Sequence, residues 1–286
     1  MPEIFYQKLV SATEADVIVF GVPFDGTVSN RPGTRFGPPA IRDATLGSED
    51  YSPWCGRDIA DLRIHDAGDL ELPVGDTAAC LAKVREFSAE CLAFSAPGIM
   101  LGGEHLVTWP RIEAFADTYG ETLFVLQFDA HADLRDDYLG VKLSHATVMN
   151  LIRARIGAGS TAAVGIRSGT KREWELLRTH PAYFGGVCGR PLDEIAAWAE
   201  KTLKGRALYI SIDLDVFDPG ILPGTGTLEP GGISFREFIS VLDAVEVCPV
   251  VGADIVELSP DYDPTGVSQA LAATVFREML LRMGGK

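Results

Sequence analysis

The sequence predicts an α/β fold in which a mostly parallel sheet is covered by helices on both faces. Short apolar runs that end in Gly or polar residues alternate with longer stretches of helical period along the chain. The runs are apolar nearly throughout, which is typical of parallel strands buried on both faces. A β-α-β-α order with such strands indicates helices on both sides of one sheet.

Seven strands are predicted where an apolar run ends in Gly or polar residues: 16–21, 98–102, 122–128, 162–167, 183–187, 207–212 and 250–256. Seven helices are predicted in the intervening stretches: 77–95, 106–117, 145–155, 170–178, 192–201, 234–244 and 267–282. Start signals support several of them, such as Ser234 with Glu237 three residues later, which fits a capping box. Segments 29–39 and 218–232 are rich in Gly and Pro and are predicted to be long loops, which are often functional.

The composition excludes several classes of protein. The 286 residues are 47% hydrophobic and include 14 Phe, 7 Tyr and 4 Trp, which favours a packed globule over a disordered chain. With 25 Lys+Arg against 40 Asp+Glu, the net charge of −15 opposes binding to nucleic acid or to an anionic membrane. The length alone is compatible with either one or two domains.

The N-terminal residues and the cysteines indicate the compartment. Residues 1–15 lack the basic and apolar regions of a signal peptide, and no apolar run is long enough to span a bilayer. The five cysteines are scattered without a CxxC pair, so we expect reduced thiols. A cytoplasmic location is the resulting expectation.

Acidic residues and imidazoles follow three of the predicted strands directly. Asp129, His131 and Asp133 follow strand 122–128, and Asp213 and Asp215 follow strand 207–212. Residues two apart in extended backbone share a face, and ligands of open α/β sheets bind beyond the carboxyl ends of the strands. His105 supplies a second imidazole just after strand 98–102. The six side chains are therefore predicted to meet at one edge of the sheet.

Four carboxylates at one site indicate bound cations. Without a cation they would repel one another, and burying unpaired charges is costly. Two divalent ions would balance the four negative charges. Two imidazoles with four carboxylates and no thiolate favour Mn²⁺ over a structural zinc ion, with Fe²⁺, Co²⁺ or Ni²⁺ also accepted in vitro. The alternative is that these residues merely end strands as turn formers. The occurrence of both groups together with His105 argues against that alternative.

Ordered motifs across nearly the whole chain resemble the ureohydrolase family of arginase and agmatinase. These motifs are Gly102-Gly103-Glu104-His105, Asp129-Ala130-His131-Ala132-Asp133, the run from Ser211 to Pro219 that contains Asp213-Leu214-Asp215, and the segments 21–25, 31–38, 223–227, 230–232 and 254–257. Glu104 stands where many relatives have Asp. The resemblance implies a three-layer α/β/α fold with an eight-stranded sheet. The eighth strand is expected between Asp61 and Asp69.

The resemblance also implies a cofactor and an assembly. One Mn²⁺ would be held by His105, Asp129, Asp133 and Asp213, and the second by Asp129, His131, Asp213 and Asp215. Because ligands from His105 to Asp215 must meet at one sheet edge, we expect residues 1–286 to form a single ureohydrolase domain. Family members usually form homotrimers or homohexamers.

The activity that the resemblance implies is hydrolysis of a guanidino group. A hydroxide bridging two Mn²⁺ ions would attack the guanidinium carbon, releasing urea and an amine. His145 matches the position proposed to pass a proton to the leaving amine, and Glu257 matches the carboxylate that pairs with the guanidinium. Asp133 completes the expected catalytic set. Without the resemblance, His145 reads as a helix-start residue and Glu257 as a solvated strand end.

The substrate is predicted to be a small cationic guanidine. Segment 133–140 is similar to agmatinases and lacks the Thr/Asn-rich loop of typical arginases. The acidic pair Asp136–Asp137 near the rim would favour a positive tail. Agmatine, cleaved to putrescine and urea for polyamine biosynthesis, ranks first, followed by aminopropylagmatine, guanidinobutyrate and arginine. A single-zinc deacetylase of similar fold and a metal-binding protein without turnover are the alternatives.

Overall fold

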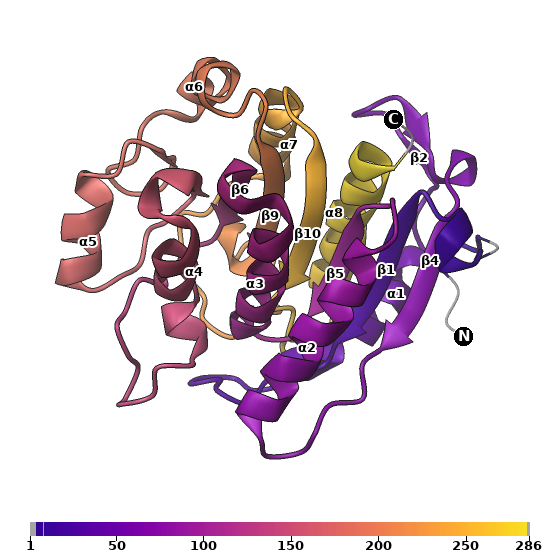
Figure 1. The fold of residues 1–286 in the computed structure, drawn as a ribbon, viewed down its shortest axis with the longest axis horizontal. Helices are drawn as coiled ribbons and strands as arrows, with labels where there is room; N and C mark the ends of the chain where they lie inside the picture. The colour runs from indigo at the N-terminus through magenta and orange to yellow at the C-terminus, as the bar shows by residue number, and fades with distance from the viewer. Residues whose placement is uncertain (1–3, 8, 285–286) are drawn as a thin grey trace.

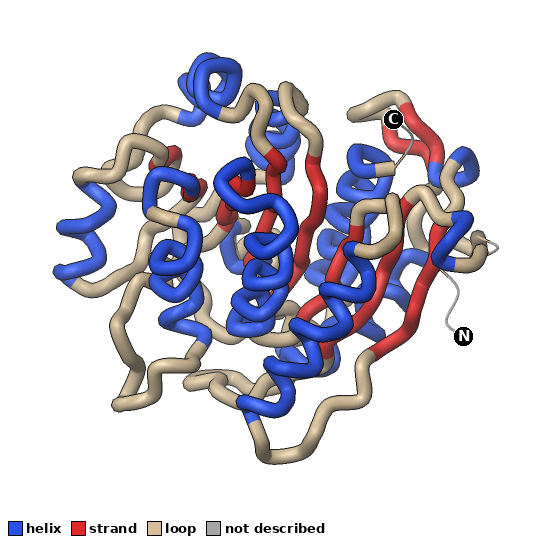
Figure 2. Tube along the Cα trace, in the orientation of Figure 1, coloured by secondary structure: helices blue, strands red, loops and turns tan. Residues whose placement is uncertain are grey.

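The computed structural model describes residues 4–7 and 9–284, and an eight-stranded sheet runs through its centre (Figures 1 and 2). Every pairing within this sheet is parallel. In spatial order the strands are β4 (Ile64–Asp69), β1 (Val17–Val22), β5 (Gly98–Gly102), β10 (Val250–Val256), β9 (Ala207–Asp213), β6 (Leu123–Phe128), β7 (Thr161–Val164) and β8 (Tyr183–Phe184). A separate antiparallel pair joins β2 (Tyr51–Ser52) to β3 (Arg57–Asp58).

Helices cover both faces of the sheet, which confirms the predicted α/β fold. They are α1 (Gly37–Thr45), α2 (Thr77–Leu92), α3 (Thr108–Tyr119), α4 (Val148–Ile156), α5 (Lys171–Arg178), α6 (Ile195–Thr202), α7 (Phe235–Val245) and α8 (Val267–Met283). Figure 1 shows α2, α3 and α4 side by side in front of the sheet, with α1, α7 and α8 behind it. Among the described residues, no helix combines the length and apolarity needed to cross a bilayer.

Two predicted strands are shorter than expected, and one helix was not predicted. Strands β7 and β8 end at Val164 and Phe184, before the predicted ends at 167 and 187. Beyond β7, Gly165 adopts φ +92° and Arg167 N bonds to Ala130 O (2.8 Å), so this segment turns toward the loop after β6. Helix α1 begins within the predicted loop 29–39, because prolines are tolerated in the first turn of a helix. The expected eighth strand is β4.

The order of the strands determines where their carboxyl ends meet. Strands β5, β10, β9 and β6 are consecutive neighbours at the centre of the sheet. Their interiors are buried, because both faces pack against helices. The arrowheads of β4 and β10 point toward the lower edge in Figure 1, and the other strands run parallel to them. The loops after the four central strands therefore share one edge.

Candidate metal centre

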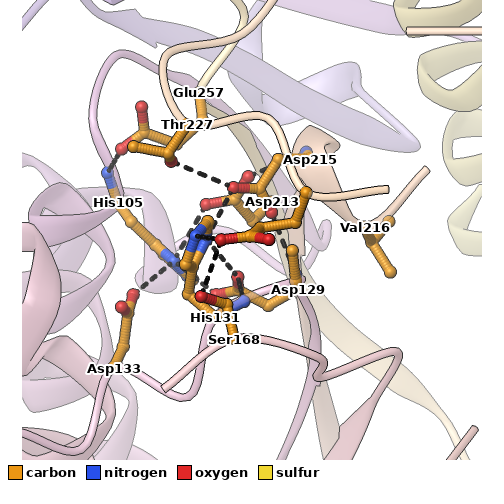
Figure 3. A network of polar contacts seen from close by, with 12 residues as sticks. His105, Asp129, His131, Asp133, Ser168, Asp213, Asp215, Val216, Thr227 and Glu257 are labelled. Carbon is orange, nitrogen blue, oxygen red and sulfur yellow. Dashed lines mark hydrogen bonds and ion pairs between the residues drawn. The ribbon is translucent and has the colours of Figure 1, made fainter. Parts of the chain in front are cut away.

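Four adjacent strand ends bring the predicted site residues together. His105 lies three residues beyond β5, Asp129 directly follows β6, and Asp213 is the last residue of β9. Glu257 directly follows β10, between β5 and β9 in the sheet. Figure 3 shows these side chains converging with those of His131, Asp133 and Asp215. The segments that carry them are separated by up to 152 positions in the sequence, between His105 and Glu257.

Three carboxylates surround one nitrogen of His105. Its Nδ1 lies 3.1 Å from Asp129 Oδ2, 3.2 Å from Asp133 Oδ2 and 3.3 Å from Asp213 Oδ2. Although buried, this nitrogen makes no hydrogen bond of acceptable geometry. One imidazole nitrogen facing three carboxylate oxygens is the arrangement of ligands around a common cation.

A second group of possible ligands shares Asp129 with the first. His131 Nδ1 lies 2.8 Å from Asp215 Oδ2 and 3.7 Å from Asp129 Oδ1. Single ligand atoms of Asp129, His131 and Asp215 lie within 4.8 Å of one another, as do those of His105, Asp129 and Asp133. Asp129 is therefore common to both groups of possible ligands.

Backbone amides and one side chain hold these carboxylates in place. Asp129 accepts hydrogen bonds from Gln127 Nε2 (2.7 Å) and His131 N (2.5 Å). Asp215 Oδ1 accepts from Ala130 N (2.9 Å), which links the loop after β6 to that after β9. Asp215 N in turn donates to Asp213 Oδ1 (2.9 Å). Each carboxylate keeps its other oxygen, or a second lone pair, free for a cation.

The pKa values of the site show a cluster of acids without enough positive charge. Burial, reinforced by the charge of Asp129, raises the pKa of Asp133 to about 7. Burial and the charge of Asp215 raise the pKa of Asp213 well above its usual value. Burial alone would lower the pKa of His131, but the carboxylates of Asp215 and Asp129 raise it to about 12. Protons thus take the place that cations would fill.

The residues present therefore fit a hard-to-borderline divalent metal. Carboxylate oxygens and imidazole suit Mn²⁺ and related ions, whereas structural zinc sites usually include thiolates. None of the cysteines belongs to the ligand groups. All four carboxylates are buried, so a cation there would be shielded from solvent.

Sequence reasoning missed a buried chain of polar residues beneath His105. His105 Nε2 lies 2.9 Å from Ser211 Oγ, which donates to Asp254 Oδ1 (2.7 Å). Asp254 also accepts from Tyr209 OH (2.6 Å). Ser211 and Tyr209 share the face of β9 that carries Asp213. A serine and an aspartate within otherwise apolar strands were the signal that could have found this network.

Glu257 faces the same centre from an unusual backbone conformation. Its carboxylate Oε1 accepts a hydrogen bond from His105 N (2.7 Å). Burial and the charge of Glu104 raise the pKa of Glu257 well above its usual value. Glu257 has φ +66° and Asp133 has φ +52°, a left-handed region that costs free energy for residues other than Gly. Such strain is common where a side chain is held in place for function.

A cleft of about 210 Å³ opens onto these side chains. His145 lines it, at the start of the 3₁₀ helix η6 (His145–Thr147) that leads into α4. The ring of Tyr138 lies 5.4 Å from that of His145, and the Arg135 guanidinium lies 5.1 Å from the Tyr138 centroid. Burial lowers the pKa of His145.

The acidic pair expected at the rim does not face the cleft. Asp136 forms an ion pair with Arg172, and Asp137 accepts a hydrogen bond from Gly140 N (2.9 Å). Neither residue lines the cleft, whereas Arg135 does. This pair of residues therefore does not support the expected preference for a substrate with a positively charged tail.

Two further histidines, His65 and His180, lie outside the site. His65 Nδ1 bonds to Val10 O (2.8 Å) and His180 Nε2 to Ala158 O (3.0 Å). Neither belongs to the ligand groups or lines the cleft.

Comparison with known proteins assigns the chain to a family. Residues 15–281 match the arginase family. The agmatinase of Bacillus subtilis (strain 168) is 41% identical over 98% of this chain and 96% of its own length. The N(1)-aminopropylagmatine ureohydrolase of Thermococcus kodakarensis is 38% identical over 92% of this chain and 90% of its own.

Solved structures agree with these matches. The agmatine ureohydrolase of Thermoplasma volcanium has a TM-score of 0.85 at 30% identity, over 96% of this chain and 92% of its own. The proclavaminate amidino hydrolase of Streptomyces clavuligerus has a TM-score of 0.86 at 30% identity, over 99% of this chain and 97% of its own. The chain therefore belongs to the arginase family, and the prediction of an agmatinase-like enzyme within it is confirmed.

Proposed function

We propose that this protein is a binuclear-manganese ureohydrolase that cleaves agmatine to putrescine and urea. One observation carries the proposal: two imidazoles and four carboxylates from three strand ends converge in a chain of the arginase family. The placement of these ligands beside a cleft that also contains Glu257 and His145 supports turnover rather than metal binding alone.

We propose the two ligand sets that the family resemblance implies. His105, Asp129, Asp133 and Asp213 would hold one ion, and Asp129, His131, Asp213 and Asp215 the other. Asp129 already belongs to both ligand groups, and Asp213 bonds to Asp215 N while facing His105, which supports bridging by these two residues. Bound Mn²⁺ ions would polarise the substrate and supply a water-derived nucleophile at neutral pH.

Glu257 is proposed to bind and orient the guanidinium. One of its oxygens accepts from His105 N, which leaves the other free to accept from the substrate. A carboxylate pairs with a planar guanidinium through charge-assisted hydrogen bonds. The fixed backbone of Glu257 would thereby place the guanidinium carbon next to the six ligands.

His145 is proposed to carry a proton to the leaving amine. It lines the cleft, and burial lowers its pKa. The imidazole is then mostly neutral at pH 7, and its protonated form is a stronger acid toward an amine. The wall formed by Tyr138 would limit the motion of this ring.

The substrate is assigned from the relatives rather than from charges in the cleft. Similar proteins include agmatinases and an N(1)-aminopropylagmatine ureohydrolase, so these two guanidines are the first candidates. Both carry a positively charged tail. Guanidinobutyrate and arginine remain as alternatives with an anionic or zwitterionic tail, and Arg135 in the cleft wall is the group that would favour them.

The decisive experiment measures urea release from these four guanidines side by side, together with the metal content of the protein. We expect urea from agmatine with the highest kcat/KM, two manganese ions per chain, and no activity after chelation. One zinc ion per chain and release of acetate from acetylated amines would support a deacetylase instead. A metal-loaded protein without turnover on either panel would be a binding protein.

We further propose that residues 1–286 form one domain, which assembles as a homotrimer or homohexamer in the cytoplasm. The single sheet to which all the proposed ligands are attached supports one domain. The assembly rests on family resemblance alone. Light scattering of the purified protein tests it, with a monomer as the contrary result.

A further inference from the structure

Both oxygens of a buried carboxylate next to the metal centre accept hydrogen bonds from one residue of a distant loop. Glu104 is fully buried and directly precedes the proposed ligand His105. Its Oε2 accepts a hydrogen bond from Thr27 N (2.7 Å), and its Oε1 accepts one from the Thr27 hydroxyl. Thr27 belongs to the loop after β1, 77 positions earlier in the chain.

The same hydroxyl also contacts the proposed proton carrier. His145 N donates to Thr27 Oγ1 at 3.2 Å. An amide N–H can only donate, so Thr27 Oγ1 must accept from His145 and is left with its own proton for Glu104. The Thr27 hydroxyl thus accepts from His145 N and donates to Glu104, and the bond to Glu104 fixes its orientation.

This contact satisfies a backbone group that the helix itself leaves unpaired. His145 is the first residue of η6, and the first N–H groups of a helix have no acceptor within it. Thr27 supplies that acceptor from outside the helix. The side chain of Ser144, the N-cap, takes part in the capping box with Thr147, and its Oγ lies 3.4 Å from His145 Nδ1.

Residues of the loop after β1 also flank the imidazole. Ser29 Oγ lies 3.4 Å from His145 Nε2. Burial lowers the pKa of His145, and a contact with the Thr27 backbone partly opposes this shift. At its far end the loop is tied down by Asn30 Nδ2, which donates to Gly226 O (2.9 Å). The loop that holds the imidazole is therefore anchored at both ends.

We propose that Thr27 is a positioning residue for His145, whose hydroxyl, oriented by Glu104, holds the start of η6 so that the imidazole faces the cleft. The inference rests on the proposed function, in which His145 carries a proton. Thr27 itself does not line the cleft and touches no reacting atom.

Thr27→Val removes the hydroxyl at nearly constant shape, and Thr27→Ser keeps it as the matched control. With the best guanidine substrate, T27V should lower kcat about tenfold to a hundredfold while KM changes less than about twofold. T27S should retain kcat within about twofold. Manganese content should be the same in all three proteins, which excludes an effect through His105.

A double-mutant cycle tests whether Thr27 acts through the imidazole. In a His145→Ala background, T27V should cause no further loss, because the group it positions is gone. An equal loss in both backgrounds would overturn the proposal. If T27V alone fails to fold, the double variant T27V/E104Q is compared with Glu104→Gln. This comparison removes the hydroxyl without leaving a charged carboxylate unpaired.

Histidine-labelled NMR of the metal-free protein gives a readout that does not depend on activity. The chain has five histidines, and His65 and His180 lie outside the site and serve as internal controls. T27V should shift or broaden the His145 imidazole signals, T27S should not, and the two controls should stay in place. Unchanged His145 signals would refute the positioning role, whereas absence of urea from the wild type would refute only the proposed function.

Discussion

His105 Nε2 and Ser211 Oγ lie 2.9 Å apart, on the side of the imidazole opposite the carboxylates. Because the Ser211 hydroxyl donates to Asp254 Oδ1, its oxygen must accept from His105 Nε2–H. With Nε2–H held by that bond, Nδ1 is the nitrogen left to bind a cation once its proton is displaced. Partners of this kind orient a ligand imidazole and raise its basicity.

Ser211→Ala should therefore weaken Mn²⁺ binding without removing a ligand. We expect about a tenfold to hundredfold loss of affinity, which is typical when the partner of a ligating histidine is lost. Isothermal titration calorimetry of the metal-free protein measures this effect. Ser240→Ala, in which an exposed hydroxyl on α7 is removed, is the control and should leave the affinity unchanged. Equal affinities for S211A and wild type would show that the network is only structural.

The negative charge of Asp213 should lower the free energy of unfolding when no metal is bound. Burial and Asp215 raise its pKa well above the ordinary value of 3.8. A raised carboxyl pKa means that its stabilising contribution is complete below pH 3.8 and is lost as the pH rises through the folded-state pKa.

Asp213→Asn should therefore make the metal-free protein more stable at pH 8, by about 1 kcal/mol or more, and the gain should vanish near pH 4. Added Mn²⁺ should stabilise the wild type more than D213N, and urea release should be lost. Urea denaturation curves at both pH values measure the change, with the exposed Asp193→Asn as a control. A loss of stability in metal-free D213N at pH 8 would contradict the repulsion argument.

Metal binding should release protons and strengthen with rising pH. The carboxylates raise the pKa of His131 to about 12 and that of His105 well above its usual value, so both imidazoles are protonated in the metal-free protein at pH 7. A metal must displace these protons before it can bind nitrogen. Calorimetry in buffers of different ionisation enthalpy should show net proton release on adding Mn²⁺. Binding without proton release would mean that neither imidazole is a ligand.

Glu257→Gln should affect substrate binding more than metal binding. The amide oxygen can still accept from His105 N, but the charge that would pair with a guanidinium is lost. We expect KM for agmatine to rise about tenfold to a hundredfold, with two manganese ions retained. Steady-state kinetics and metal analysis of the same preparation provide the measurement. Loss of manganese with an unchanged KM would place Glu257 among the metal-supporting residues instead.

The convergence of the six candidate ligands could be predicted because it follows from local rules. Asp129 and Asp213 come directly at the ends of apolar runs, and the carboxyl ends of neighbouring parallel strands share an edge. The pairings of Ser211 with His105 and of Thr27 with Glu104 could not be predicted, since each joins segments 106 or 77 positions apart. Ser211 within an apolar strand signals a buried polar network, but nothing local to either segment specifies the partner residue. Helix α1 was missed for a local reason, because its first turn contains two prolines.

Asp263 and Ser268 connect the loop after β9 to the start of α8. Its carboxylate accepts from Thr265 N (3.0 Å) and Ser268 N (2.7 Å), and Ser268 Oγ accepts from Gly224 N (2.8 Å). Burial alone would raise the pKa of Asp263, but hydrogen bonds from Thr265 and Ser268 lower it to about 2. Its stabilising contribution is therefore present above the ordinary value of 3.8 and is lost as the pH falls through about 2.

Asp263→Asn should thus destabilise the fold at neutral pH by about 1–3 kcal/mol, because a carboxylate that accepts several hydrogen bonds is replaced by a weaker acceptor. The difference from wild type should shrink steadily below pH 4. Asp261→Asn, at an exposed position two residues earlier, should change little and controls for the general loss of charge. Chemical denaturation between pH 2.5 and 7 measures both variants. A D263N deficit that stayed constant across this range would show that packing, rather than ionisation, accounts for the contribution of Asp263.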